Sequence, residues 1–316
     1  MTQRVLAIVG PTASGKSALA LTLAEKLGCE IVSCDSMQIY RGMDIGTAKP
    51  TPEERERVRH HMIDIRDPGE DYSAAEYGED AARAVAEIFS RGKIPLFCGG
   101  TGLYLDAALT GRHAEAPAGD PAFRAELLAR GKSEDGRLAL YRELKEVDPE
   151  SAAATHPNNL RRVVRALEIY RVSGIPKSAF DRASRELPPQ FDSLVIGIGF
   201  ADRKELYRRI ERRVDAMMEA GLPEEAETLR MRGLLTPDST AGQAIGYRQF
   251  FPYFEGRATL DDVSREIKTA TRRYAKRQLT WFRAKPGIVW LDGGSDTLYA
   301  DAERLCSDFL SDGSRP

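Results

Sequence analysis

The residues from 10 to 17 constrain this chain more than any other stretch. They fit the phosphate-binding pattern G-x-x-x-x-G-K-[ST] at every fixed position, and they read Gly10, Pro11, Thr12, Ala13, Ser14, Gly15, Lys16 and Ser17. The apolar run 5–9 predicts a buried strand before them, and 18–27 predicts a helix after them that ends at Gly28. Backbone N–H groups in such a loop curl around an anion, Lys16 would bridge phosphate oxygens, and the Ser17 hydroxyl would hold Mg²⁺. We therefore predict a polyphosphate site at this turn.

Composition narrows the class of protein. The 316 residues are 42% hydrophobic and 30% charged, which is typical of a soluble globular chain with one large domain or two modest ones. No apolar run approaches membrane-spanning length and no signal peptide precedes the first strand, so we expect a cytoplasmic protein with no membrane partner. The four cysteines read as free thiols, and the pair His60-His61 is expected to be structural, because neither set has metal-ligand spacing. The net charge of −2 excludes a uniformly basic nucleic-acid binder.

The order of predicted elements indicates an α/β protein with a P-loop-type parallel sheet flanked by helices. Strands are expected at 5–9, 30–33, 61–65, 94–98, 194–198 and 288–291. Helices are expected at 18–27, 73–91, 203–220, 223–232, 240–254 and 260–284. Strand-like runs vanish between about 114 and 189, where amphipathic helices follow one another. We therefore predict a core domain of residues 1–113 and 190–316, interrupted by an all-helical insertion domain of residues 114–189.

Asp35 follows the second predicted strand, and the turn Gly99-Gly100-Thr101-Gly102 follows the fourth. Ligand-handling residues of open parallel sheets lie at the carboxyl ends of strands, so both are expected near the phosphate loop. The residues alone leave three roles open for Asp35: a Mg²⁺ ligand, a turn cap, or a group that serves a nucleophile while the polyphosphate departs.

Basic residues cluster in three places: Arg161, Arg162 and Arg165; Arg208, Arg209, Arg212 and Arg213; and the stretch 267–285, which has seven basic residues and no acidic one. Such clusters form either solvated helix faces or a nucleic-acid surface. Tyr274, Trp281 and Phe282 lie within the last cluster, and aromatic side chains among cations suit looped RNA, whose bases can stack.

At this point the sequence resembles the tRNA dimethylallyltransferases (isopentenyl-tRNA transferases, the IPP transferase family). The matching stretches span nearly the whole chain: GPTASGKS at 10–17, SCDSMQIYRGMDIGTAKP at 33–50, DIRDP at 64–68, YSAAEY at 72–77, GGTGLY at 99–104, HPNNLRRVVRALEIY at 156–170, RRIERRVDAMMEAGL at 208–222, AIGYRQ at 244–249 and TRRYAKRQLTWFR at 271–283. Their number and order make the resemblance specific.

The resemblance implies a reaction. Members of this family transfer a dimethylallyl group from dimethylallyl diphosphate to the exocyclic N6 amine of the adenosine just 3′ of the anticodon, in tRNAs that read codons beginning with U, and release diphosphate. The phosphate loop would cradle the diphosphate, with Lys16, Arg213 and Mg²⁺ on Ser17 neutralising its charge. Asp35 would accept the proton of the amine and position it, and Thr101 would assist by hydrogen bonding.

The resemblance also implies partners. The tRNA, through its anticodon stem-loop, would contact the insertion domain and three segments, whose residues are Asp35, Ser36, Met37, Gln38, Arg161, Arg162, Arg165, Gln243, Gly246, Tyr247 and Arg248. The target base would have to leave its stack to reach Asp35. The chain is expected to act as a monomer.

Two other functions stay open. One is a small-molecule enzyme with the same loop, either an adenylate isopentenyltransferase or a nucleotide kinase that uses ATP. The other is an RNA-binding switch that reads nucleotide state and has no enzymatic activity.

Overall fold

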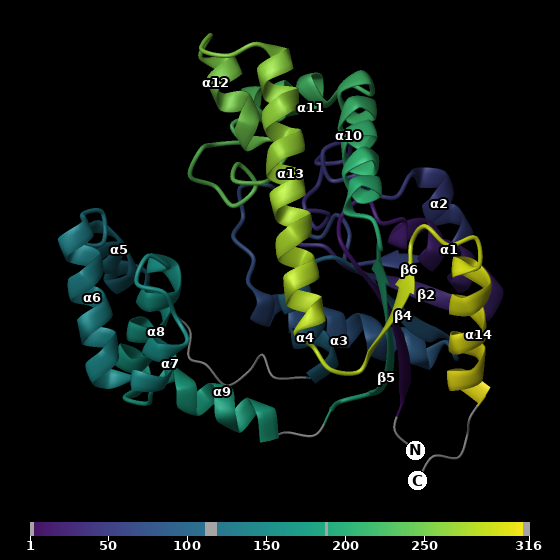
Figure 1. Ribbon diagram of the computed structural model, residues 1–316, viewed down its shortest axis with the longest axis horizontal. Helices are drawn as coiled ribbons and strands as arrows, with labels where there is room; N and C mark the ends of the chain where they lie inside the picture. Colours follow the sequence, from purple (N-terminus) through teal and green to yellow (C-terminus); the bar gives the residue numbers. More distant parts are fainter. Residues whose placement is uncertain (1–2, 111–118, 187–188, 312–316) are drawn as a thin grey trace. The chain divides into compact units, whose positions relative to one another are not determined.

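Six parallel strands form the framework of the computed structural model, which describes residues 3–110, 119–186 and 189–311. Their bounds are β1 Arg4–Val9, β2 Cys29–Cys34, β3 His60–His61, β4 Ile94–Gly99, β5 Asp192–Gly199 and β6 Ile288–Asp292. The strands lie side by side in the order β3-β2-β4-β1-β5-β6. Figure 1 shows β5 next to β6 at one edge of the sheet. Each paired neighbour is parallel, and β1 pairs with both β4 and β5. The predicted parallel α/β class is confirmed.

Helices cover the sheet and extend beyond it. In the sheet-containing part they are α1 Lys16–Leu27, α2 Pro52–Arg57, α3 Ala74–Ser90, α4 Gly102–Thr110, α10 Arg203–Glu219, α11 Leu222–Met231, the 3₁₀ turn η1 Arg248–Phe250, α12 Phe251–Phe254, α13 Leu260–Arg283 and α14 Leu298–Ser311. A capping box starts α3, since Ser73 and Glu76 bond reciprocally to each other's backbone N–H. Three of these helices, α2, α4 and α14, were not predicted from the sequence.

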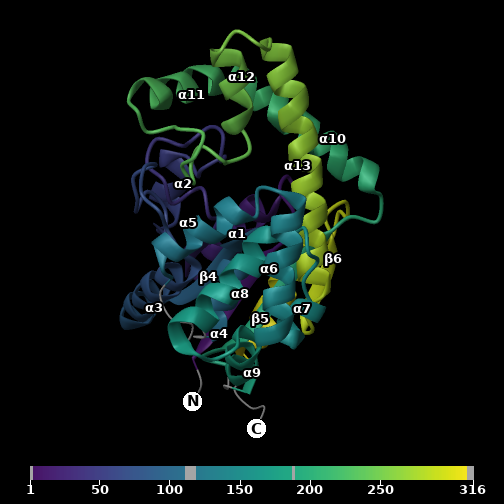
Figure 2. The ribbon, with the colours of Figure 1, turned by 90° about the vertical axis from the view of Figure 1, so that its left-hand side faces the viewer.

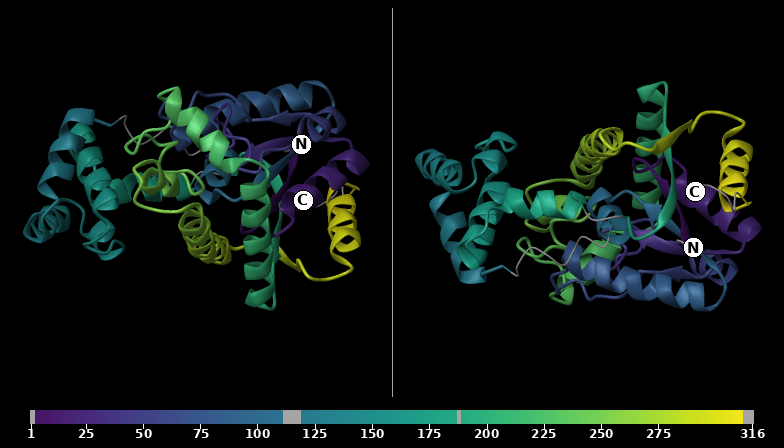
Figure 3. Two further views of the ribbon diagram at one scale, coloured as in Figure 1. Left: turned by 90° about the horizontal axis from the view of Figure 1, so that it is seen from above. Right: turned by 90° about the horizontal axis from the view of Figure 1, so that it is seen from below.

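Both faces of the sheet are buried, which explains the continuous apolar runs of its strands. Because side chains alternate along a strand, Leu6 and Ile8 point to one face while Val5, Ala7 and Val9 point to the other. The first face packs against α1 and α14, and the second against α3, α4 and the C-terminal end of α13. Figure 3 shows these helices on the two sides of the sheet.

A third apolar cluster lies beyond the strands and shapes the loops that follow them. Figure 2 shows α10, α11 and α12 gathered around the N-terminal half of α13. The cluster joins these helices to the loop after β2 through the buried side chains of Ile39, Tyr40, Met43, Val214, Leu222, Leu229, Tyr247, Phe250 and Ile267. Loop residues are therefore packed almost as tightly here as strand residues are in the sheet.

Two predicted elements are wrong in extent. The strand expected at 61–65 stops at His61, because Met62 and Asp64 adopt left-handed φ values of 63° and 57° that end an extended strand. The helix expected at 240–254 is replaced by successive turns up to Tyr247, followed by η1 and α12. Gly246, with φ of 99°, interrupts any helix at that point.

The chain divides into two compact units, Met1–Leu109 with Gln190–Pro316, and Thr110–Pro189. The second unit contains α5 Pro121–Arg130, α6 Glu134–Val147, α7 Pro149–Ala153, α8 Leu160–Ser173 and α9 Lys177–Glu186, and no strand occurs among its described residues. Its own core consists of Leu127, Leu140, Leu144, Ala152, Val163, Val164, Ala166 and Leu167. The predicted boundary at residue 114 lies outside the described residues.

Two further expectations concern the surroundings of the chain. All four cysteines are buried and unpaired, as predicted. Among the described residues, no helix combines the length and the apolar character that crossing a membrane requires.

Candidate active site

The phosphate loop joins β1 to α1 in a backbone conformation that needs small residues. Gly10 and Gly15 have φ values of 153° and 90°, and a Cβ on Gly10 would lie 2.8 Å from the carbonyl oxygen of Ile198. No side chain caps the start of α1, so the N–H groups of its first turn remain available to an anion. Ser14 is buried below the loop, and its hydroxyl has no partner among the described residues.

A buried glutamine holds the loop in place. The Oε1 of Gln278 on α13 accepts a hydrogen bond from the Thr12 N–H at 2.9 Å, and its Nε2 donates to the Gly100 carbonyl at 3.0 Å. A Cβ on Gly100 would lie 2.0 Å from that Nε2, so the glycine is required for this approach. Sequence reasoning missed Gln278. The available signal was an uncharged polar residue at a buried position in the basic C-terminal half of α13.

Asp35 and Thr101 lie at the same edge of the sheet as the phosphate loop, because each of the three segments follows the carboxyl end of one of the successive parallel strands β2, β4 and β1. The Oδ1 of Asp35 accepts from the backbone N–H of Met37 at 2.9 Å and of Gln38 at 3.4 Å. This turn leaves the other carboxylate oxygen without a hydrogen-bond partner among the described residues. Thr101 anchors the same segment, since its Oγ1 accepts from the Ser36 N–H at 3.1 Å. The segment therefore presents one carboxylate oxygen for chemistry.

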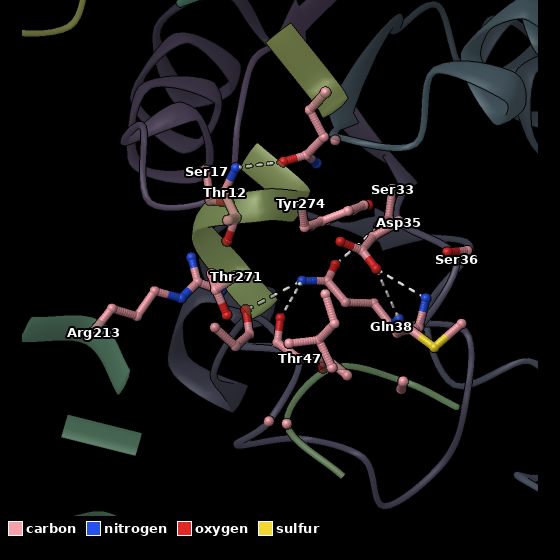
Figure 4. Close-up of a pocket in the computed structure, with 18 of the residues that line it drawn as sticks. Thr12, Ser17, Ser33, Asp35, Ser36, Gln38, Thr47, Arg213, Thr271 and Tyr274 are labelled. Carbon is pink, nitrogen blue, oxygen red and sulfur yellow. Dashed lines mark hydrogen bonds between the residues drawn. The ribbon is translucent and has the colours of Figure 1, made fainter. Parts of the chain in front are cut away.

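Two cations face the same space as Asp35. Figure 4 shows Arg213 reaching from α10 toward the cavity that Thr12, Ser17 and Asp35 also line. Burial lowers the pKa of Lys16 and of Arg213, and the nearby Asp35 carboxylate partly opposes both shifts. An anion bound between them would relieve the cost of holding two cations in a partly desolvated site. The geometry thus favours a multiply charged anion.

The cavity has a volume of about 390 Å³, which suits a small ligand. One part is lined by Thr12, Lys16, Ser17 and Arg213, and another by the apolar side chains of Ile210, Val214, Met217, Ile245 and Ile267. Tyr274 of α13 completes the wall, and burial, with Asp35 nearby, raises its pKa to about 12, so its phenol stays protonated at neutral pH. The cavity can therefore hold a ligand with an anionic head and an apolar tail.

Gln38 closes the side of the cavity opposite the phosphate loop. Its Oε1 accepts from the Ser33 hydroxyl at 2.9 Å, and its Nε2 donates to the carbonyls of Thr47 and Ala48 at 3.3 and 3.2 Å (Figure 4). This amide thus ties the end of β2 to the loop segment at residues 47 and 48.

The remaining residues with an expected RNA role fall into two groups. Gln243, Gly246 and Arg248 line the cavity, with Gln243 and Arg248 exposed, whereas the Tyr247 side chain is fully buried and points into the protein. Any contact of Tyr247 with RNA would therefore use its backbone.

The second group lies on α8 of the helical unit. Arg161 and Arg162 are exposed there, while Arg165 forms an ion pair of 2.8 Å with the buried carboxylate of Glu168. Arg165 therefore also has a structural partner in its own unit.

The histidine pair has mainly structural contacts. His61 Nε2 lies 2.7 Å from Glu30, whose other main partner is Arg91, and His60 Nδ1 lies 2.7 Å from the Val58 carbonyl. The His60 ring also reaches the cavity wall. Among the described residues, no group of three or more His, Cys, Asp or Glu side chains could hold a metal ion by itself.

Fold and site together define a phosphate-loop α/β protein in which the carboxylate of Asp35 lines the same cavity as the loop. Residues 38–285 match the family model described as IPP transferase. The chain is 49% identical over 294 residues to a tRNA dimethylallyltransferase of Geobacillus thermodenitrificans, covering 92% of this chain and 91% of the relative. A tRNA dimethylallyltransferase of Carboxydothermus hydrogenoformans is 45% identical over 98% of both chains.

Solved structures agree with the sequence relatives. The crystal structure of the full-length tRNA isopentenylpyrophosphate transferase of Bacillus halodurans matches with a TM-score of 0.72 at 42% identity, covering 99% of this chain and 98% of that one. A eukaryotic dimethylallyltransferase acting on tRNA matches with a TM-score of 0.84 at 32% identity, covering 100% of this chain and 81% of that one. The chain belongs to the IPP transferase family, and it is an enzyme of the prenyltransferase class.

Proposed function

We propose that the chain transfers a dimethylallyl group from dimethylallyl diphosphate to the N6 amine of an adenosine in tRNA. The adenosine is the one 3′-adjacent to the anticodon in tRNAs that read codons beginning with U, and diphosphate is released. One observation carries the proposal: a cavity with two cations at one end and an apolar wall also exposes a carboxylate, in a chain of this family.

The leaving group binds at the phosphate loop. Backbone N–H groups of the loop and of the first turn of α1 bind the diphosphate, and Lys16 and Arg213 balance its charge. As the bond between the allylic carbon and the bridging oxygen breaks, negative charge grows on the diphosphate. Lys16 and Arg213 stabilise that charge without reorganising, because both are already held in place. The Lys16 Nζ donates to the Pro11 carbonyl at 3.3 Å, and Arg213 is partly buried.

The nucleophile approaches from the Asp35 side. The N6 nitrogen forms the new bond to the allylic carbon, and its proton passes to the free carboxylate oxygen of Asp35. Thr101 positions this segment through the Ser36 N–H, which keeps Asp35 at a fixed place beside the reacting atoms. The apolar side chains of Val214, Met217 and Ile267 exclude water that would otherwise capture the allylic cation.

The residues present fit a Mg²⁺ ion. The Ser17 hydroxyl is a hard oxygen donor on the cavity, and Mg²⁺ is commonly held by one or two protein oxygens together with phosphate oxygens and water. Ser17 would hold the ion, which when bound supplies further charge neutralisation on the diphosphate. The absence of a closed cluster of three acidic or imidazole ligands among the described residues agrees with a metal that is shared with the substrate.

The tRNA anticodon stem-loop supplies the acceptor in this proposal. Gln243 and Arg248 at the cavity, and Arg161 and Arg162 on α8, are exposed polar groups suited to RNA phosphates. We further propose that the chain acts as a monomer in the cytoplasm, where its four unpaired cysteines would stay reduced.

The test is direct. Purified protein is incubated with dimethylallyl diphosphate and an unmodified tRNA of the expected codon class, and the digested nucleosides are examined by mass spectrometry for dimethylallyl-adenosine. A matched tRNA with guanosine in place of the target adenosine should give no product. Transfer to free AMP without tRNA would indicate an adenylate isopentenyltransferase, and phosphorylation of a nucleotide by ATP would indicate a kinase.

A further inference from the structure

A carboxylate outside the cavity organises the loop that faces it. Glu225 lies in the first turn of α11, and its Oε2 accepts from the backbone N–H groups of Asp44 at 2.9 Å and Ile45 at 2.8 Å. Its Oε1 accepts from the Gly46 N–H at 3.1 Å. Three successive N–H groups thus form a concave anion site, and the protein supplies the anion itself.

The same carboxylate also binds the turn that carries Gln243 and Arg248. The Tyr247 hydroxyl donates to Glu225 Oε1 at 2.6 Å, and burial together with that carboxylate raises the pKa of Tyr247, so the phenol remains a donor. The Tyr247 ring fills the space next to Gly46, where a Cβ would lie 2.6 Å from the ring. Glu225 therefore fixes two loops, 44–46 and 244–248, against each other.

Hydrogen bonds and the short backbone segments between them connect Glu225 to the proposed base. The carbonyls of Thr47 and Ala48, directly after the loop that Glu225 holds, accept from the Gln38 amide. The Gln38 N–H in turn donates to Asp35 Oδ1. A shift of the 44–46 loop would move both acceptors of Gln38 and, through it, the turn that orients Asp35.

We propose that Glu225 is a positioning residue for the acceptor adenosine, acting through Gln38 on the wall opposite the phosphate loop. The inference rests on the proposed function, since it assigns Glu225 to the acceptor side of that reaction. Gln278, and not Glu225, holds the phosphate loop, so the two ends of the cavity have separate supports. Loss of Glu225 should therefore affect the acceptor and leave diphosphate binding intact.

The experiment compares Glu225→Ala, Glu225→Gln and Tyr247→Phe with wild type and with Glu224→Ala. Glu224 is the matched control, because it is in the same turn of α11, carries the same charge and is exposed. Each protein is measured for binding of labelled dimethylallyl diphosphate, for kcat and KM with an unmodified tRNA transcript, and for melting temperature. Rates are divided by the number of diphosphate-binding sites, so that unfolded protein does not count.

We expect kcat/KM for tRNA to fall about tenfold to a hundredfold in Glu225→Ala, with diphosphate affinity within about threefold of wild type. Glu225→Gln keeps one carbonyl oxygen and should recover part of the loss, and Tyr247→Phe should show a smaller loss of the same kind. Wild-type rates per site in all three variants, with only a lower melting temperature, would overturn the inference, and so would an equal loss of diphosphate affinity. Should Glu225→Ala not fold, Glu225→Gln and Tyr247→Phe decide the question by the same criteria. A wild-type protein that binds the diphosphate but modifies no tRNA would refute the proposed function itself, and the inference would fall with it.

Discussion

Replacing Asp35 by asparagine separates the possible roles of this carboxylate. Asparagine keeps Oδ1, the atom that accepts from the Met37 and Gln38 N–H groups, so the turn should survive and folding stability should change by less than about 1 kcal/mol. The second oxygen becomes an NH₂ group that cannot take a proton. Loss of a positioned base costs about 10²–10⁴-fold in rate, which corresponds to about 3–5 kcal/mol in the barrier.

The effect on diphosphate binding is expected to be small because two terms oppose each other. Asp35 raises the pKa of Lys16, so its removal slightly weakens the protonation of that ammonium group. The same change removes a negative charge beside the bound diphosphate. We expect the affinity for dimethylallyl diphosphate to stay within about threefold of wild type, under about 1 kcal/mol.

Three measurements separate these effects. Single-turnover transfer with enzyme in excess gives the rate of the chemical step, equilibrium binding of labelled dimethylallyl diphosphate gives the affinity, and thermal melting gives the stability. If Asp35 is a Mg²⁺ ligand, Asp35→Asn should lower the affinity for the diphosphate. If Asp35 is only a turn cap, the substitution should lower the melting temperature. A variant that transfers at nearly the wild-type rate would refute the base role, and a diphosphate oxygen of the substrate would then be the next candidate for accepting the proton.

Three further predictions test other parts of the molecule. Lys16→Ala should lower the diphosphate affinity and the transfer rate together. Because burial lowers the pKa of Lys16, the affinity of the wild-type protein, measured by equilibrium binding, should weaken as pH rises through that lowered pKa. Arg161→Ala should raise the KM for tRNA and reduce the slope of its salt dependence by about one, with diphosphate affinity unchanged; an equal loss of both affinities would argue against an RNA role. The Arg91 guanidinium lowers the pKa of Glu30 from 4.5 to about 2, so this ion pair stabilises the fold above pH 4.5 and its contribution is lost as pH falls to about 2. Glu30→Gln should therefore lower the free energy of urea unfolding at pH 7 by at most about 3 kcal/mol and by little at pH 2, while the exposed control Glu87→Gln should change it by less than about 1 kcal/mol at either pH.

Local patterns predicted the framework of this protein well. The run 5–9, the phosphate loop and the helix after it are each specified by neighbouring residues, and buried parallel strands have a continuous apolar signature. The order of strands in the sheet has no such signature, although it decides which segments meet at the site: Thr101 follows β4, the direct neighbour of β1, and Asp35 follows β2, the next strand along.

The stretch 240–254 shows why some elements were predicted wrongly. Ala241, Ala244, Tyr247 and Phe250 are all buried, and their spacing of three residues suits a helix as well as it suits successive turns. Tertiary packing decides between the two, because the Tyr247 ring must fill the space beside Gly46 and its hydroxyl must reach Glu225. Gly246 is a local sign of a break in the helix, but the partners that select the turns, Gly46 and Glu225, lie outside the stretch.

The side chains that support the site were missed for the same reason. Three supporting side chains bind the backbone of loops: Gln278, Glu225 and Lys49. Gln278 and Glu225 reach segments far from them in sequence, and Lys49 donates to the Tyr40 carbonyl and to two aspartates within an irregular loop region. Loops at the ends of strands have no ladder of backbone hydrogen bonds, so buried polar side chains must satisfy and fix them. Residues that carry chemistry can be found by their type and motif, whereas residues that position them differ from ordinary surface residues only in what they touch. Variants of the supporting residues should therefore separate positioning from chemistry: an altered Gln278 should disturb diphosphate binding first, and an altered Glu225 the acceptor first.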